Sequence, residues 1–212
     1  MGYTAVIDYD CGNMFSISRA LERFDAKFEI TRDPEAILNA SKVILPGVGS
    51  YGEGIKKLKE RNLVDPLHDF FKSGKLMMGI CLGMQLLVDS SDEFGFHEGL
   101  GFIAGRTEIL KPLKKEKVPH IGWNSVLKPK GSKEDIWTET ILEGIEEGRD
   151  FYFMHSHMVV TKDPDNCLAE TEYGGIRFAS IIKKNNLIGC QFHPEKSGKL
   201  GLSLVRKFIK QN

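Results

Sequence analysis

The feature that most constrains the fold is the alternation of short apolar runs with amphipathic segments along the first half of the chain. The apolar runs are short, rich in aliphatic residues and typical of buried strands; between them apolar residues recur at helical spacing. We expect strands over residues 3–10, 27–33, 42–47 and 75–80, and helices over residues 15–24, 33–38, 51–74 and 81–91. Strands and helices that alternate in this way predict an α/β fold of flavodoxin-like type, with a mostly parallel central sheet covered by helices on both faces.

The second half of the chain has a different pattern. Strand-like segments at residues 102–110, 125–129 and 150–160 are separated by turns rather than by long helices, which predicts an antiparallel extension of the same sheet. Residues 175–192 read as a hairpin that turns at Asn185 and Asn186, and residues 200–211 as a closing helix. Since no linker or repeat interrupts the chain, we expect residues 1–212 to form a single domain.

Charge and composition exclude several kinds of partner. The 29 Lys and Arg residues balance the 29 Asp and Glu residues, so the chain lacks the basic excess of a nucleic-acid-binding protein. No apolar stretch is long enough to span a membrane, and the N-terminus does not resemble a signal peptide, so we expect a cytoplasmic protein that does not bind a membrane. The four cysteines are widely spaced and are expected to be free thiols.

One of these cysteines, Cys81, lies where a predicted buried strand meets a helix, with Gly79 and Gly83 two residues to either side. This pattern is the cysteine form of a nucleophile elbow, in which small residues allow a sharp turn that presents the nucleophile at the carboxyl edge of the sheet. The N–H groups at the start of the helix would stabilise a thiolate and an oxyanion. An isolated cysteine would be read as a buried thiol, but the two glycines and the junction favour a nucleophile.

A cysteine nucleophile needs a base and a group that orients the base. The hairpin supplies both at its end, because His193 is followed by Pro194 and Glu195. The proline restricts the backbone between the imidazole and the carboxylate. We therefore predict a triad of Cys81, His193 and Glu195.

A glycine-rich loop follows the third predicted strand, at residues 46–50. It lacks the spacing of a Walker loop or of a dinucleotide-binding fingerprint, so phosphate binding is not favoured. Its backbone N–H groups, at Val48 and Gly49, are expected to form an oxyanion hole together with the N–H of Leu82.

Together the segments GICLGMQLL, QFHPEKS and PGVG resemble the class I, triad-type glutamine amidotransferases along nearly the whole chain. Three further segments, DYDCGNMFSISRAL, PGVGSYG and VPHIGWN, are similar to the glutaminase subunits of imidazole glycerol phosphate synthases, which act in histidine biosynthesis. The resemblance implies that Cys81 attacks glutamine, that His193 moves protons and that Glu195 orients His193.

The resemblance also implies residues that bind the substrate and the partner. Glutamine would be held by Gln85, Glu93, Ser156 and His157. The partner would be a (β/α)8 cyclase subunit that forms a heterodimer with this chain, uses the ammonia, and produces imidazole glycerol phosphate and an aminoimidazole carboxamide ribotide. The residues facing it would be Asn13, Pro119, Trp123 and Lys196.

The chain departs from the family pattern at two places. Asp10 and Cys11 replace a glycine-containing pair, and His157 lies in a His-Ser-His-Met run where His-Ser-Tyr-Tyr is commoner. The second departure leaves room for a paralogue that supplies ammonia for surface-sugar synthesis. A stand-alone cysteine γ-glutamyl hydrolase on the same fold is the other alternative. A non-catalytic binding subunit is disfavoured by the intact triad.

The remaining histidines and the tryptophan have ordinary explanations. His155 and His157 have no third ligand with suitable spacing, so we expect no metal, and nothing in the sequence calls for a cofactor. His120, next to Pro119, is interpreted as structural or as part of an interface rather than as a chemical group. From the residues alone, Trp123 fits a core position and an interface position about equally well. The resemblance favours the interface.

Overall fold

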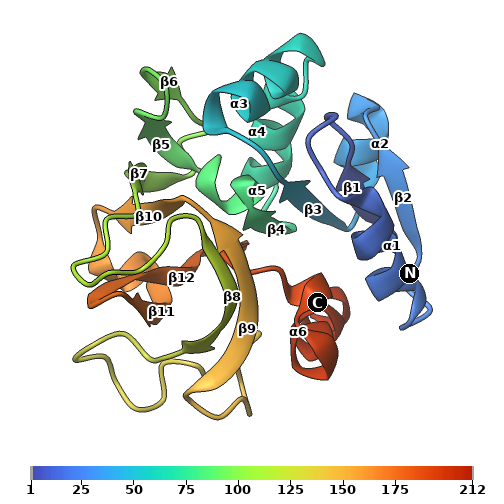
Figure 1. The fold of residues 1–212 in the computed structure, drawn as a ribbon. Helices are drawn as coiled ribbons and strands as arrows, with labels where there is room; N and C mark the ends of the chain where they lie inside the picture. Colours follow the sequence, from blue (N-terminus) through green and yellow to red (C-terminus); the bar gives the residue numbers. More distant parts are fainter. Residues whose placement is uncertain (1, 212) are drawn as a thin grey trace.

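The computed structural model describes residues 2–211 and confirms the alternation of strands and helices in the first half of the chain (Figure 1). The elements there are β1 (Thr4–Ile7), α1 (Met14–Glu22), β2 (Phe28–Thr31), α2 (Pro34–Asn39), β3 (Lys42–Gly47), α3 (Tyr51–Glu60), α4 (Val64–Lys72), β4 (Leu76–Cys81) and α5 (Leu82–Gln85). Asp33 caps α2, because its side chain accepts a hydrogen bond from the N–H of Glu35 at 3.2 Å.

The rest of the chain is mainly strands. They are β5 (Val88–Ser91), β6 (His97–Glu98), β7 (Ile103–Ile109), β8 (His120–Val126), β9 (Arg149–His155), β10 (His157–Thr161), β11 (Cys167–Tyr173), β12 (Ile176–Lys184) and β13 (Leu187–Cys190). Two 3₁₀ turns, η1 (Pro164–Asn166) and η2 (Pro194–Lys196), and the closing helix α6 (Gly198–Lys210) complete the described residues.

The central sheet has seven strands in the order β11-β12-β13-β4-β3-β1-β2. Strands β2, β1, β3, β4 and β13 run parallel to one another, and β12 and β11 add an antiparallel extension. In this register Gly47 pairs with Cys81, and Cys190 pairs with Ile80. The ends of β3, β4 and β13 therefore lie at one edge of the sheet, where they place the glycine-rich loop, the cysteine elbow and the His-Pro-Glu segment next to one another.

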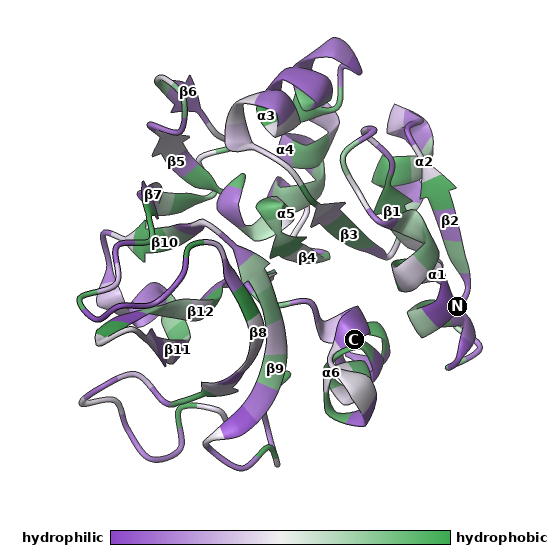
Figure 2. Ribbon diagram, viewed as in Figure 1, coloured by the Kyte–Doolittle hydropathy of each residue, from purple (hydrophilic) through white to green (hydrophobic). Residues whose placement is uncertain are grey.

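Apolar side chains alternate between the two faces of this sheet, so each face has its own core. Along β3, for example, Val43 and Leu45 belong to the core under α2, α3, α4 and α5, whereas Ile44 belongs to the core under α1 and α6. Figure 2 shows the contrast between β1 and β4, which are coloured mainly as hydrophobic, and the hydrophilic outer turn of α3. The prediction of helices on both faces is confirmed.

The structure corrects two predictions for other segments. Residues 102–110 and 150–160 do not extend the central sheet: they contribute to a four-stranded sheet, β10-β7-β5-β6, and to a two-stranded ribbon, β8-β9, which packs its apolar side against the core under α6. The antiparallel extension comes instead from the hairpin and β11. The helix expected over residues 81–91 ends at Gln85, since Val88–Ser91 pairs with β7 as a strand.

Two simpler expectations concern the cysteines and the membrane. All four cysteines are free, as predicted. Among residues 2–211 no helix combines the length and the apolar character needed to cross a membrane.

Candidate active site

Cys81 occupies a strained backbone conformation at the junction of β4 and α5. Its φ is +53° and its ψ is −110°, a combination that costs energy for a side chain other than glycine. The flanking glycines make the turn possible, because a Cβ at Gly83 would lie 1.8 Å from the carbonyl oxygen of Leu45, and one at Gly79 would lie 2.7 Å from the carbonyl oxygen of Gly83. The predicted elbow is therefore present, although the helix that follows it is only one turn long.

The structure brings His193 and Glu195 together just beyond the end of β13. His193 Nδ1 lies 2.9 Å from Glu195 Oε1, and each side chain is 2% exposed. Pro194 opens the 3₁₀ turn η2, which fixes this short spacing. Burial lowers the pKa of His193, but Cys81 and Glu195 outweigh burial and raise it to about 10. The carboxylate thus favours the imidazolium form of His193.

The sulfur of Cys81 lies between polar groups from two other segments. Its thiol donates to the carbonyl oxygen of Met154 at 3.7 Å, and Gln191 Nε2 lies 3.9 Å from the sulfur. Within the described residues, His193 Nε2 has no hydrogen-bond partner in this conformation, although it is buried. Because this nitrogen is buried, has no partner and lies near the Cys81 thiol, it can exchange a proton with a group that enters the site.

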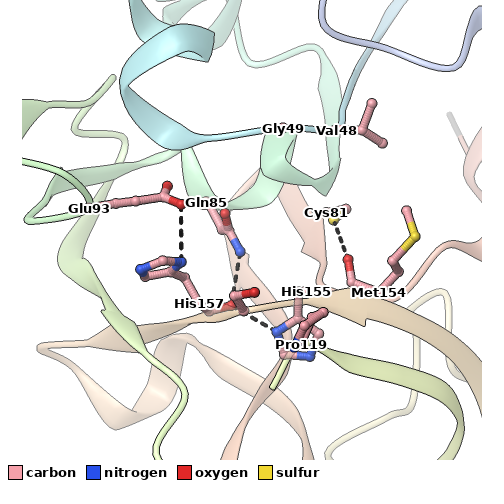
Figure 3. Close-up of a pocket in the computed structure, with 10 residues that line it drawn as sticks. Val48, Gly49, Cys81, Gln85, Glu93, Pro119, Met154, His155 and His157 are labelled. Atoms are coloured by element: carbon pink, nitrogen blue, oxygen red, sulfur yellow. Dashed lines mark hydrogen bonds and ion pairs between the residues drawn. The ribbon is translucent and has the colours of Figure 1, made fainter. Parts of the chain in front are cut away.

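Cys81 opens onto a cavity of about 240 Å³ between the central sheet and the junction of β9 and β10 (Figure 3). All of the residues predicted to bind substrate line it, together with the predicted oxyanion loop. The lining consists of Val48, Gly49, Cys81, Gln85, Glu93, Pro119, Met154, His155, Ser156 and His157. Sequence reasoning had not placed Met154 or His155 at a binding site, and had assigned Pro119 only to an interface.

The wall opposite Cys81 carries an acidic group and several amide groups. Glu93 Oε1 lies 3.3 Å from His157 Nδ1 (Figure 3). Glu93 Oε2 accepts a hydrogen bond from the N–H of Tyr51 at 2.6 Å. Gln85 donates to the carbonyl oxygen of His157 at 3.0 Å. The cavity therefore combines a carboxylate, a histidine and hydrogen-bonding groups, which suits a small zwitterionic molecule.

The glycine-rich loop does not yet form the predicted oxyanion hole. The N–H of Val48 donates to the carbonyl oxygen of Cys11 at 2.6 Å, so it is not available to an oxyanion in this conformation. Gly49 has a φ of +116°, a conformation that favours glycine. A rotation of the peptide between Gly47 and Val48 is required before this N–H can reach an oxyanion.

The predicted partner-facing residues differ in exposure. Trp123 is 57% exposed on β8, and Pro119 is exposed beside it. Lys196 is half-buried. Asn13 has a structural role as the N-cap of α1, because its side chain accepts from the N–H of Ser16 at 3.1 Å. Burial of Asn13 against a partner would have to preserve this hydrogen bond.

A strained cysteine elbow at the edge of a parallel sheet, next to a buried His-Glu pair, is the arrangement typical of enzymes that use a cysteine nucleophile. Solved structures share the fold: a glutamine amidotransferase has a TM-score of 0.70 at 17% identity, covering 99% of this chain and 98% of that one. The PurLQS structure from Thermotoga maritima also has a TM-score of 0.70, at 20% identity, covering 99% and 98%.

Sequence comparison narrows the class. The sequence profile described as Glutamine amidotransferase class-I matches residues 5–212. The chain is 42% identical over 213 residues to the Imidazole glycerol phosphate synthase subunit HisH 1 of Legionella pneumophila, covering 99% of each. It is 44% identical over 206 residues to the Imidazole glycerol phosphate synthase subunit HisH of Aquifex aeolicus, covering 97% and 95%. The chain belongs to the class I glutamine amidotransferases and, within them, to the HisH subunits of imidazole glycerol phosphate synthase, which act in histidine biosynthesis.

Proposed function

We propose that Cys81, His193 and Glu195 form the catalytic triad with which this chain hydrolyses glutamine to glutamate and ammonia. The observation that carries this assignment is the positive φ of Cys81 at the sheet edge, combined with the buried His193–Glu195 pair. Glutamine would lie in the 240 Å³ cavity, with its charged end near Glu93 and His157 and its amide near Cys81.

The chemistry divides into two displacements. The Cys81 thiolate forms a bond to the amide carbon, and His193, as the imidazolium, gives a proton to the amide nitrogen while the carbon–nitrogen bond breaks and ammonia leaves. Water then attacks the glutamyl thioester with His193 as the base, which restores the thiol and releases glutamate. Glu195 stays ionised and holds the imidazole in the required orientation.

The oxyanion of each tetrahedral intermediate would be held by the N–H groups of Leu82 and of the Val48–Gly49 loop. Because the N–H of Val48 is bonded to Cys11 in this conformation, we infer that the chain alone is a weak glutaminase. Rotation of the loop when a partner and its substrate bind would complete the oxyanion hole. Because hydrolysis would then depend on the partner, glutamine would not be hydrolysed when the ammonia cannot be used.

The names of the relatives imply a partner subunit. We infer that the partner is a (β/α)8 cyclase, that the two chains form a heterodimer in the cytoplasm, and that Pro119, Trp123, Asn13 and Lys196 face it. The cyclase would combine ammonia with its own substrate to give imidazole glycerol phosphate and the carboxamide ribotide. Full-length similarity to these subunits favours this function over a sugar-pathway paralogue or a stand-alone γ-glutamyl hydrolase.

Replacement of Cys81 by Ala tests the triad. In the complex with the cyclase, Cys81→Ala should abolish synthesis from glutamine and leave synthesis from added ammonia unchanged. Cys167→Ala is the matched control, since that cysteine is half-buried on β11 and does not line the cavity; it should keep both activities. Glutamine-dependent synthesis by Cys81→Ala would contradict the assignment, and strong glutamate release by the wild-type chain alone would favour the stand-alone hydrolase.

A further inference from the structure

A row of buried polar side chains runs from β8 to the wall of the cavity. Asn124 Nδ2 lies 3.4 Å from His120 Nε2, His120 Nδ1 lies 3.2 Å from His155 Nε2, and His155 Nδ1 lies 2.8 Å from the carbonyl oxygen of His157. His120 and His155 are 2% and 5% exposed. The antiparallel pairing of β8 with β9 makes the row possible, because it places His120 opposite His155.

The end of the row determines the direction of every hydrogen bond in it. A carbonyl oxygen only accepts, so His155 must carry its proton on Nδ1. Its Nε2 is then an acceptor, so His120 must donate from Nδ1, and the Nε2 of His120 must accept from the amide of Asn124. Asn124 also donates to the carbonyl oxygen of Glu172 at 3.0 Å, which anchors the outer end. Both imidazoles are thus neutral Nδ1–H tautomers. The hydrogen bonds all run in one direction, from Asn124 through His120 and His155 to the carbonyl oxygen of His157, and we call this row the relay.

The chemical surroundings of the two rings favour this neutral state. His120 stacks on Tyr173 with centroids 4.0 Å apart and on Phe153 at 5.0 Å, and the ring of Phe178 lies 6.1 Å from His120 and 5.1 Å from His155. No carboxylate contacts either ring among the described residues. Burial lowers the pKa of His120 to about 4 and that of His155 to about 3.

The inner end of the relay lies at the cavity. The carbonyl oxygen of His157 accepts two hydrogen bonds, one from His155 and one from Gln85 at 3.0 Å (Figure 3). The preceding carbonyl, that of Ser156, accepts from the N–H of Leu110 at 2.8 Å. The backbone between β9 and β10 is therefore held at successive peptides, and this is the backbone that presents Ser156 and His157 to the substrate.

We propose that His120 is a positioning residue for glutamine binding: through His155 it orients the 155–157 junction and Gln85. This role rests on the function proposed above, because it requires that glutamine occupy the cavity. His120 itself does not line the cavity. It also lies on the opposite side of β8 from Ile121 and Trp123, which are 58% and 57% exposed, so His120 can be changed without altering that outer surface.

Isosteric amides separate the hydrogen bond from the packing. The amide nitrogen of Asn falls near the Nδ1 position of His, and that of Gln near the Nε2 position. His120→Asn should therefore still donate to His155, whereas His120→Gln should not, leaving a buried acceptor without a donor. Phe178→Leu is the matched control, because it removes packing against both rings and no hydrogen bond.

The glutamine KM of the complex with the cyclase is the main measurement. We expect His120→Gln to raise this KM about tenfold, with kcat changed by less than about threefold, and His120→Asn to stay within about threefold of wild type. Synthesis from added ammonia should be unchanged in both. Equal KM values for the Asn and Gln variants would overturn the proposal. It would also be overturned if Phe178→Leu raised the glutamine KM tenfold while losing the same amount of Tm as His120→Gln.

The tautomers test the relay without any substitution. In ¹⁵N-edited NMR spectra of the imidazole nitrogens, wild-type His120 and His155 should both show a protonated Nδ1 and an unprotonated Nε2 at pH 7. A protonated Nε2 on either ring would overturn the relay even if the Gln variant fails to fold. If wild-type complex released no glutamate from glutamine, the proposed function would fail instead, and the tautomers would still report on the relay.

Discussion

Two buried histidines of the candidate site have opposite acid–base behaviour: His155 lines the cavity, and His193 lies next to Cys81, which also lines it. His193 and His155 are 2% and 5% exposed, but the pKa of His193 is raised to about 10 and that of His155 is lowered to about 3. Burial lowers the pKa in both cases. The difference comes from the neighbouring groups: Cys81 and the Glu195 carboxylate raise the pKa of His193, whereas the Nδ1 of His155 bonds only to a neutral carbonyl.

This difference divides the cavity into a reactive wall and a positioning wall. By the reactive wall we mean Cys81, which lines the cavity, together with the buried His193–Glu195 pair, which does not; in the proposed triad its charge, strain and unpartnered nitrogen favour proton transfer. The positioning wall, formed by residues 155–157 with Gln85, has directed hydrogen bonds between neutral groups, which favour a fixed shape. The same residue type therefore performs different tasks because its hydrogen-bond partners differ.

The largest effect should come from removing the charge on the reactive wall. Glu195→Gln keeps the size of the side chain and leaves His193 without its anionic partner, so the pKa of His193 should fall. We expect kcat for glutamine hydrolysis in the complex to drop by about a thousandfold, with little change in the glutamine KM. Steady-state kinetics would measure both parameters.

A variant of His120, which is proposed to act on the positioning wall through His155, provides the contrast. His120→Gln should change KM and leave kcat nearly unchanged, as described above. If Glu195→Gln changed KM and kcat in the same proportions as His120→Gln, the division of the cavity into two walls would be wrong.

The next effect concerns the backbone of the reactive wall. A methyl group at Gly83 would lie 1.8 Å from the carbonyl oxygen of Leu45, which the rigid β3 strand cannot move away. Gly83→Ala should lower the free energy of unfolding by about 3 kcal/mol or more, as measured by urea denaturation. Gly144→Ala is the control: no atom lies within 4 Å of its added Cβ, and only its φ of +70° opposes the change, so about 1 kcal/mol is expected. Equal losses would mean that the elbow is not tightly packed.

The reactive wall could largely be predicted from the sequence, for a physical reason. Cys81 and its glycines are adjacent in the chain, and His193 and Glu195 are two residues apart across a proline, so local backbone rules place each group. The parallel strand order then brings the two segments to one edge. The hairpin turn at Asn185 and Asn186 was predictable for the same reason, since it is local.

The positioning wall could not be predicted in the same way. Its central contact joins His120 to His155, and the register that pairs them depends on how a long irregular segment between β8 and β9 folds. The break at Ser156 was also missed, so two strands with different partners were expected to be one. A usable signal was present in β8, where buried His120 and half-buried Asn124 alternate with exposed Ile121 and Trp123.

A smaller effect should appear in the pH dependence of stability. Because the pKa of His120 falls from 6.5 in the unfolded chain to about 4 in the folded chain, only the unfolded state binds this proton between those pH values. Stability contributed by neutral His120 is therefore present above pH 6.5 and is lost as the pH falls toward 4. Carboxylates lose stability in the same range, so the variant His120→Asn is needed for comparison.

Urea denaturation of both proteins at pH 5, 6 and 7 would measure the difference. Between pH 6 and pH 5 the wild type should lose up to about 1.4 kcal/mol more than His120→Asn, which corresponds to one proton. Parallel pH profiles for the two proteins would show that the pKa of His120 is the same in the folded and unfolded chains, which would contradict its lowered pKa.

The smallest effect should come from Asp10, which precedes Cys11 in the loop after β1. Asp10 has a φ of +66°, and its carboxylate bonds to Arg61, with Nε 3.1 Å away, and lies 3.5 Å from Arg32. These exposed ion pairs are screened by water and salt, and the positive φ opposes their gain. Asp10→Gly should therefore change the Tm by no more than about 3 °C at ordinary ionic strength, as measured by calorimetry.

Since Asp10 precedes Cys11, whose carbonyl accepts the hydrogen bond from the N–H of Val48, glutamate release by the isolated chain should be measured as well. If neither the Tm nor the rate of glutamate release changes, Asp10 does not influence the reactive wall. A large loss of Tm would show that the loop around Asp10 is as tightly constrained as the backbone at Gly83.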